Sequence, residues 1–469
     1  MKRRTLLRRS LLAVVLLLPV ALFALWVKPP ELLRIGANYS AKIVCSNVFL
    51  AGRDADEVLN SDVQAPGIAI LKLMRVTVDR SHHVVHAGFL GFIGNGLAVA
   101  RPGVGCAVVP DGNLVAARLD AGVAAADGRA TLAAAAAVAA SAAAGALWPD
   151  GSRVDTNDGI SALLADDTLV GPGMRAVVVV DHGRILAERY AAGFAATTPL
   201  LGWSMTKSVV AGLIGMLVKD GKMTLDQSGG WPVIAGDNRS RIRIADLLAM
   251  SSGLRFNEGY GTVSDVTRML YLEPDTAGFA RAQPSLHPPG EVWSYSSGTA
   301  NILSRLLQDA AGPIGAGFPA ARLFTPLGMT SATMETDENG TLVGSSYMYA
   351  TARDWARYGL FLAQDGVWNG QELLPRGYVA MMAQPVAASA GEYGHGLVWL
   401  RIADAIPSGQ NPDAAFGIPA DCFWLEGHDG QSMAVIPSRQ LVVVRLGLTP
   451  AHLHYSPLAL LGAVLKTRL

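Results

Sequence analysis

The pair Ser204 and Lys207 has the residue types and the spacing of a nucleophile with its general base. A serine hydroxyl attacks a carbonyl only after a base removes its proton, and lysine serves as that base once its pKa is lowered. Apolar residues follow at helical spacing, so Ser204 is predicted to begin a helix with Lys207 on the same face. The positive end of that helix disfavours the protonated lysine, and the N–H of Ser204 could donate to an oxyanion.

The alternative for these two residues is a serine that caps a helix, followed by a solvated lysine. The context favours catalysis, because the chain has eight lysines and contains this single Ser-x-x-Lys. Residues 174–180 and 185–190 are apolar and β-rich on either side of a glycine-containing turn, which predicts a β-hairpin. The nucleophile is therefore expected at a helix start, downstream of a hairpin.

Further motifs follow in a fixed order, and the stretches are 202–208 (Gly-Trp-Ser-Met-Thr-Lys-Ser), 247–254 (Leu-Leu-Ala-Met-Ser-Ser-Gly-Leu), 287–290 (His-Pro-Pro-Gly), 293–298 (Trp-Ser-Tyr-Ser-Ser-Gly) and 427–431 (Gly-His-Asp-Gly-Gln). Together they resemble the serine β-lactamase and penicillin-binding-protein superfamily, with its Ser-x-x-Lys, Ser/Tyr-x-Asn and Lys/His-x-Gly motifs. The chain is most similar to the class C β-lactamase-like branch that includes 6-aminohexanoate-dimer hydrolases and related esterases. The resemblance covers approximately residues 171–448.

This resemblance implies an α+β fold, in which an antiparallel β-sheet is flanked by helices and a mostly helical subdomain is inserted at about residues 224–368. It implies that Tyr295 relays a proton to the leaving group, although a tyrosine in such a triplet could also be a core residue. Ser297 stands where β-lactamases usually have asparagine, which fits the amide-hydrolase and esterase branch better.

The third motif assigns substrate-side roles to a short segment after a predicted strand. His428 would bind or polarise the substrate, Gly430 would let it approach the backbone, and the Gln431 amide would be the second oxyanion donor. The same resemblance makes Tyr260, in the loop after residues 251–254, a substrate contact. Residues 422–425, 433–437 and 441–446 are predicted to be adjacent antiparallel strands.

Three classes of function remain open after the motifs are assigned. The first is a serine hydrolase that cleaves an ester or small amide through an acyl-enzyme on Ser204. The second is a β-lactamase or cell-wall D,D-peptidase, and penicillin distinguishes it by turnover or stable acylation. The third is a non-catalytic binding protein on the same fold, against which the intact Ser204, Lys207 and Tyr295 argue.

Composition narrows the partners that the protein could have. The chain of 469 residues is 51% hydrophobic and 16% charged, which indicates a folded protein. Lys+Arg and Asp+Glu balance at 38 each, which argues against nucleic-acid binding. Phosphate-loop, dinucleotide and zinc-protease motifs are lacking, so no cofactor is expected. Strand geometry would point His82, His83 and His86 to different faces, so no metal site is expected there.

Residues 1–28 are predicted to be a signal anchor or a signal peptide. Five basic residues precede an uncharged run at 11–27, and no small-x-small cleavage site follows. A retained anchor is favoured, which would hold the chain at the periplasmic face of the inner membrane. A cleaved signal would leave it periplasmic.

The predicted domains are a variable extension at residues 29–150, ending in an alanine-rich connector, and a hydrolase domain at 171–469. Residues 75–109 of the extension predict a few strands, and its function is not readable from sequence. In an oxidising compartment Cys45 and Cys106 could form a disulfide, which would leave Cys422 unpaired. Sequence alone leaves that pairing open.

Overall fold

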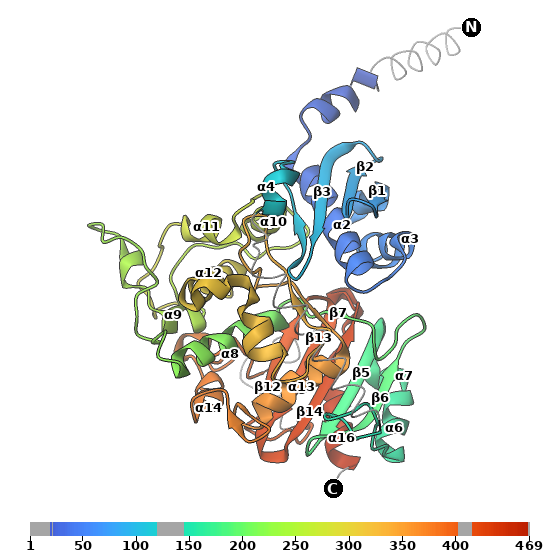
Figure 1. The fold of residues 1–469 in the computed structure, drawn as a ribbon, viewed down its shortest axis with the longest axis vertical. Coiled ribbons are helices and arrows are strands. Elements are labelled where there is room, and N and C mark those ends of the chain that lie inside the picture. The colour runs from blue at the N-terminus through green and yellow to red at the C-terminus, as the bar shows by residue number, and fades with distance from the viewer. Residues whose placement is uncertain (1–18, 21, 120–144, 402–414, 468–469) are drawn as a thin grey trace.

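A computed structural model describes residues 19–20, 22–119, 145–401 and 415–467. The predicted α+β architecture is observed, with antiparallel sheets packed against helices. An N-terminal unit of helices and strands lies against a larger unit that contains the predicted catalytic motifs (Figure 1). The predicted alanine-rich connector, at 121–146, lies almost entirely outside the described residues.

The larger unit is built on a sheet of five antiparallel strands in the order β12-β13-β14-β5-β6. These strands are β5 (Met174–Asp181), β6 (Arg184–Tyr190), β12 (Phe423–Gly427), β13 (Gln431–Ile436) and β14 (Leu441–Gly447). The hairpin and the three adjacent strands predicted from the sequence are thereby confirmed. Their register pairs Val178 with Glu188 and with Val444, so the amino-terminal hairpin completes a sheet begun by carboxy-terminal strands.

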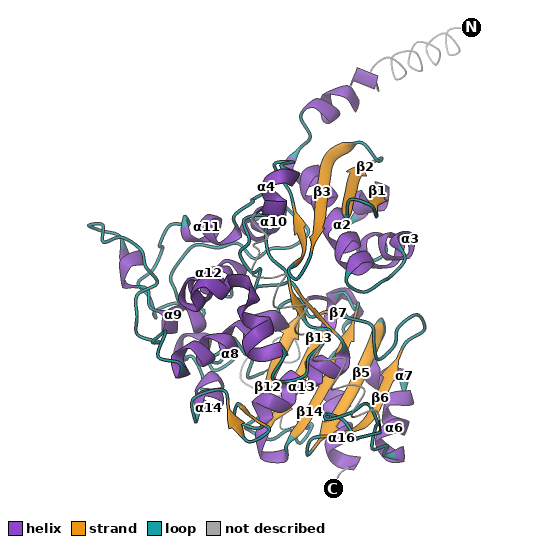
Figure 2. Ribbon diagram, in the orientation of Figure 1, coloured by secondary structure: helices purple, strands orange, loops and turns teal. Residues whose placement is uncertain are grey.

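Both faces of this sheet are buried, which explains its continuous runs of valine. Successive residues point to opposite faces, so Val178 and Val444 join one apolar core while Val177 and Val443 join another. The first core includes α8 (Met205–Lys219) and α13 (Ala352–Ala363), and the second includes α6 (Asp158–Ala165) and α16 (Leu458–Thr467). The result is a sheet covered by helices on each side (Figure 2).

The regular elements of the segment between α8 and α13 are mainly helices, as predicted, and loops connect them. Its helices are α9 (Ile244–Leu248), α10 (Asp265–Tyr271), α11 (Thr276–Arg281) and α12 (Ser297–Ala311). A small sheet formed by β7 (Leu200–Leu201), β9 (Met348–Ala350) and β8 (Thr333–Met334) joins this insert to the turn before α8. The remaining short elements of the larger unit are α7 (Asp167–Val170), α14 (Tyr378–Met382), β10 (Val367–Trp368) and β11 (Gln371–Glu372).

The N-terminal unit is one long helix on a four-stranded antiparallel sheet. Its elements are α2 (Glu31–Phe49), α3 (Ala55–Val58), β1 (Met74–Asp79), β2 (Val84–Phe89), β3 (Ile93–Arg101), β4 (Gly105–Val108) and α4 (Leu114–Leu119). The strands predicted for this region are confirmed. Gly96 permits the close packing of β3 on α2, because a Cβ there would lie 2.4 Å from the carbonyl oxygen of Ala37.

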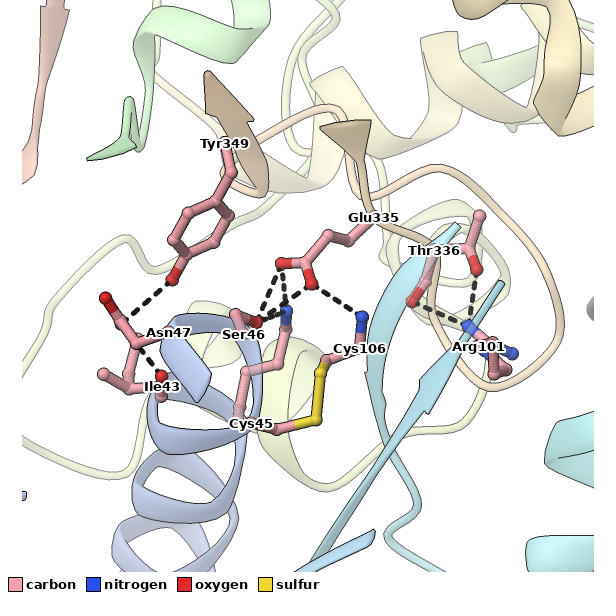
Figure 3. The surroundings of a disulfide bond; sticks show 10 residues. Ile43, Cys45, Ser46, Asn47, Arg101, Cys106, Glu335, Thr336 and Tyr349 are labelled. Atoms are coloured by element: carbon pink, nitrogen blue, oxygen red, sulfur yellow. Dashed lines mark hydrogen bonds and ion pairs between the residues drawn. A yellow bond between two sulfur atoms is a disulfide. The ribbon is translucent and has the colours of Figure 1, made fainter. Parts of the chain in front are cut away.

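A buried polar cluster connects the N-terminal unit to the larger one (Figure 3). The Glu335 carboxylate, just after β8, pairs with the Lys42 ammonium and accepts hydrogen bonds from Ser46 Oγ at 2.9 Å and Cys106 N at 2.6 Å. The structure joins Cys106 to Cys45 in a disulfide, which links β4 to α2. Cys422 is buried and, within the part of the chain that the structure describes, does not take part in a disulfide.

The apolar run at 11–27 falls mostly outside the described residues, so the predicted anchor is largely beyond what the structure describes. Among the helices that are described, none has both the length and the apolar character that crossing a bilayer requires.

Candidate active site

Ser204 lies in the turn between β7 and α8, at the position that caps the helix. Its side chain is partly exposed, whereas Lys207, one turn into α8, is 1% exposed. The preceding residue, Trp203, has a φ of +48°, a left-handed conformation that non-glycine residues rarely adopt. A Cβ at Gly202 would lie 2.2 Å from the Trp355 ring, so only glycine fits there. The turn therefore presents Ser204 at a partly open surface, with the Lys207 side chain buried beneath it.

The Lys207 Nζ has three polar neighbours. It lies 2.9 Å from Ser204 Oγ, 3.1 Å from Ser297 Oγ and 2.8 Å from the carbonyl oxygen of Ser345. Ser345 comes from the segment before β9, and Ser297 is the first residue of α12. Three different elements thus fix the position of the amine.

Hydrogen-bond directions in this cluster follow from the chemistry of its members. The Ser345 carbonyl can only accept, so it takes one Lys207 hydrogen. Ser297 donates its N–H and its hydroxyl hydrogen to the two oxygens of the Glu258 carboxylate, so its Oγ must accept a second Lys207 hydrogen. A neutral amine has no further hydrogen, and its lone pair is left facing Ser204 Oγ. The arrangement therefore orients Lys207 as a proton acceptor for Ser204.

Burial favours the neutral form that this role requires. It lowers the pKa of Lys207 to about 8, while the negative charge of Glu258 acts in the opposite direction. Lys207 consequently carries a usable fraction of neutral amine at neutral pH. Glu258 limits that fraction while fixing the direction of the Ser297 hydroxyl.

Tyr295 lies beside the same two residues. Lys207 Nζ is 4.8 Å from the centroid of its ring, and the Tyr295 hydroxyl lies near the Ser204 side chain. The ring is stacked on Trp399 at 5.4 Å and meets Tyr393 edge-on at 6.0 Å. Burial raises the pKa of Tyr295 well above its ordinary value. The phenol therefore keeps its proton at neutral pH and is placed to donate it near Ser204.

His428 and Tyr260 form an aromatic wall with Trp203. The His428 ring is stacked on Tyr260 at 4.9 Å and meets Trp203 edge-on at 5.6 Å. Tyr260 also lies near Ser297, and burial raises the pKa of Tyr260 well above its ordinary value. The structure thus brings two of the predicted substrate-side residues to the nucleophile turn and to the serine that holds Lys207.

Gly430 and Gln431 are committed to other contacts. The Gly430 carbonyl accepts from Arg445 Nη1 at 2.9 Å, and the Gln431 side-chain amide donates to the Gly447 carbonyl at 2.6 Å. The glycine that meets the nucleophile turn is Gly427, at which a Cβ would lie 2.2 Å from the Gly202 carbonyl oxygen. Oxyanion binding by the Gln431 amide stays a prediction.

The edge of β12 opposite β13 lies on the Tyr295 side of the site. Trp399 exchanges backbone hydrogen bonds with Trp424 on this edge. Because the Trp399 ring also stacks on Tyr295 at 5.4 Å, this pairing fixes the aromatic group around Tyr295 to the edge of the main sheet.

The sequence did not reveal Glu258, Gly427 or Trp399 as site residues. Glu258 lies in a loop with no periodicity, and it meets Ser297 across 39 positions of the chain. The only available signal was its place two residues before Tyr260. Within the described ranges, no group of three or more His, Cys, Asp or Glu residues is arranged to bind a metal ion.

Three comparisons relate the chain to known proteins. Residues 166–447 match the family model described as Beta-lactamase. A 6-aminohexanoate-dimer hydrolase of Paenarthrobacter ureafaciens is 26% identical over 218 residues, which cover 44% of this chain and 55% of that protein. The chain thus spans about half the length of this curated relative.

Solved structures share the fold. A Bacillus anthracis protein provisionally named 6-aminohexanoate-dimer hydrolase superposes with a TM-score of 0.55 at 20% identity, covering 68% of this chain and 89% of that one. A family VIII carboxylesterase superposes with a TM-score of 0.51 at 15% identity, covering 66% of this chain and 96% of that one. At these identities the likeness establishes the fold alone.

Proposed function

Because the chain belongs to the Beta-lactamase family, whose members are serine hydrolases, we propose that it cleaves an ester or a small amide through an acyl-enzyme on Ser204. The observation that carries this proposal is the hydrogen-bond geometry of Lys207, whose only unengaged direction faces Ser204 Oγ. A helix cap followed by a solvated lysine would not bury the amine or give it two fixed acceptors. The geometry is that of a nucleophile and its base.

In the first step the Ser204 hydroxyl proton passes to Lys207 Nζ while Oγ bonds to the substrate carbonyl carbon. The carbonyl π electrons move to oxygen, and the N–H of Ser204 donates to the resulting oxyanion from the start of α8. The second donor is the amide of Gln431, at the start of β13. Both donors are part of rigid elements, which suits electrostatic stabilisation of a transition state.

In the second step the oxyanion collapses and the bond to the leaving group breaks. Tyr295 donates its phenolic proton to the departing oxygen or nitrogen, and the Lys207 ammonium returns a proton to Tyr295. Water then attacks the acyl-enzyme with the same groups acting in reverse, which releases the acid and regenerates Ser204. The raised pKa of Tyr295 supports this role, because an ionised tyrosine could not donate.

Two observations support an ester or small amide as the substrate. Ser297 replaces the asparagine usual in β-lactamases, and its hydroxyl is engaged by Glu258 and Lys207. The curated relative is named for hydrolysis of 6-aminohexanoate dimer, and a carboxylesterase shares the fold.

Active-site labelling tests the proposal. The purified protein is treated in parallel with a fluorophosphonate probe and a fluorescent penicillin, and mass spectrometry locates the adduct. We expect the fluorophosphonate on Ser204 and no adduct on the Ser204→Ala variant. A stable penicillin adduct on Ser204 would instead indicate a D,D-peptidase, and rapid penicillin turnover a β-lactamase. If the well-folded protein reacted with neither probe, the result would favour the third class of function, a non-catalytic binding protein.

The pH dependence of kcat/KM should report the titration of Lys207. Lysine acts as a base only when neutral, so kcat/KM should rise about tenfold per pH unit below pH 8 and level off above it, given a Lys207 pKa of about 8. Initial rates on an activated ester between pH 6 and 9.5 would measure the midpoint. The His428→Asn variant should keep the same midpoint, and a midpoint that moved with this substitution would make His428 the base.

A further inference from the structure

An apolar cavity of about 160 Å³ lies between the N-terminal unit and the candidate site. One wall comes from α2, through Leu32 and Ile35, and from the loop that carries Ile68 and Ile70. The opposite wall is built from Trp203, Tyr260 and His428. Neither unit could form this cavity alone, because each supplies only one side of it.

The cavity reaches the catalytic groups through its second wall. Trp203 directly precedes Ser204, and Tyr260 lies near Ser297, which in turn accepts from Lys207 at 3.1 Å. The loops from the two units touch beside it, because a Cβ at Gly261 would lie 3.7 Å from Ile68. A group held in this cavity would therefore lie next to an acyl group on Ser204.

The chemistry of the walls favours an uncharged aliphatic ligand. Of the polar side chains that line the cavity, Thr267 Oγ1 donates to the Thr262 carbonyl at 2.8 Å, and Tyr39 and Tyr271 meet edge-on with ring centroids 5.6 Å apart. His428 and Asp429 face each other at one end, 3.5 Å apart. Most of the surface that the N-terminal unit gives to the cavity is aliphatic, from Leu32, Ile35, Ile68, Ile70 and Leu71, and such surface binds hydrocarbon.

The position of Tyr295 indicates which half of the substrate enters. A leaving group must lie beside Tyr295, its proton donor, and Tyr295 is surrounded by Tyr393 and Trp399. Among the described residues that line the cavity, none belongs to this aromatic group. The surroundings of the leaving group and the lining of the cavity therefore share no residue, and we assign the cavity to the acyl half.

We propose that this cavity binds a linear aliphatic acyl chain, and that the N-terminal unit thereby sets the acyl-chain preference of the enzyme. The proposal rests on the acyl-enzyme chemistry proposed above. It assigns the substrate class as esters or amides of medium-chain fatty acids, and it gives residues 31–119 a role in specificity.

A chain-length series on the full protein tests this inference. We expect kcat/KM for p-nitrophenyl alkanoates to rise about fourfold for each methylene from acetate upward, which is the effect of burying one methylene, until the cavity is filled. Spontaneous hydrolysis of each ester, measured in parallel, corrects for intrinsic reactivity. An active enzyme with equal kcat/KM for acetate and octanoate would overturn the inference and leave the proposed function intact.

Two matched substitutions locate the effect. Ile68 and Leu90 are similarly exposed, at 41% and 42%, and both belong to the N-terminal unit, but Leu90 does not line the cavity. Ile68→Asp should lower the ratio of kcat/KM for octanoate over acetate at least tenfold, whereas Leu90→Asp should leave it unchanged. Equal effects of the two substitutions would contradict the assignment. Ile70→Trp, which fills the cavity, should shift the preferred chain to a shorter one.

Binding without catalysis separates the two proposals. Calorimetric titration of the Ser204→Ala variant should show that octanamide binds at least tenfold more tightly than acetamide, with the difference lost when Ile68→Asp is added. This result would support acyl-chain binding in the cavity even if the protein hydrolysed no ester. A lack of hydrolysis would count against the proposed function alone. Equal binding of the two amides would overturn the inference.

Discussion

Replacing Lys207 by methionine lowers kcat/KM by about 10⁴-fold or more, because the substitution removes the base and keeps the volume of the buried side chain. The Ser204 hydroxyl would retain its position. The lone pair of the Lys207 amine, which accepts the hydroxyl proton, would be absent. Activated esters such as p-nitrophenyl acetate give the most sensitive measurement. The fluorophosphonate reaction should be lost with the hydrolysis, since both require an activated Ser204.

Lys219 provides the control for this substitution. It lies in the last turn of the same helix, and Lys219→Met should leave kcat/KM and the unfolding temperature close to those of the parent. Comparing the two variants separates loss of the base from damage to α8. A Lys207→Met protein with normal turnover would refute the assignment of the base.

The second large effect concerns stability. Replacing Glu335 by glutamine should lower the free energy of unfolding by about 3–5 kcal/mol, the usual cost of leaving one charge of a buried pair without its partner. Glu335 is completely buried, and Lys42 loses the carboxylate that neutralises it. Glutamine keeps an oxygen that can accept from Ser46 and Cys106, so the substitution isolates the charge. Urea unfolding followed by fluorescence would measure the change.

Two further variants test whether the unpaired charge of Lys42 causes this loss of stability. Adding Lys42→Met to Glu335→Gln should recover most of the lost stability, because the uncompensated buried ammonium is gone. Glu338→Gln, three residues along, should have little effect at pH 7, because burial and then its hydrogen bond with Asp111 raise the pKa of Glu338 to about 8. If the double variant were as unstable as Glu335→Gln, the charge would not be the cause.

Local patterns in the sequence predicted the parts of the molecule that depend on neighbouring residues. Ser204 and Lys207 are one helical turn apart, and the strands of the main sheet appear as runs of valine whose two faces are both buried. Such features are set by periodicity within a few residues. The family resemblance then supplied Tyr295 and His428, which lie far from Ser204 along the chain.

Contacts between segments that are far apart in the chain could not be predicted from local sequence patterns. Asn38 Nδ2 donates to the Tyr271 carbonyl across 233 positions, and Lys42 pairs with Glu335 across 293. These contacts dock the N-terminal unit, so the wall it gives to the cavity could not be inferred from its own sequence. Glu258 escaped notice for the same reason, because its importance comes from Ser297 and Lys207 rather than from its flanking residues.

The left-handed backbone at Trp203 is maintained by the packing of the same residue's side chain. That conformation costs about 1–3 kcal/mol in a residue with a bulky side chain, and the packing of an indole that is 6% exposed offsets it. Glycine at this position would relax the backbone but remove one wall of the apolar cavity, and losing a buried aromatic side chain usually costs about 3–5 kcal/mol. Directed evolution that screens for heat tolerance would therefore keep tryptophan here, and the shape of the cavity would be inherited as a by-product of stability.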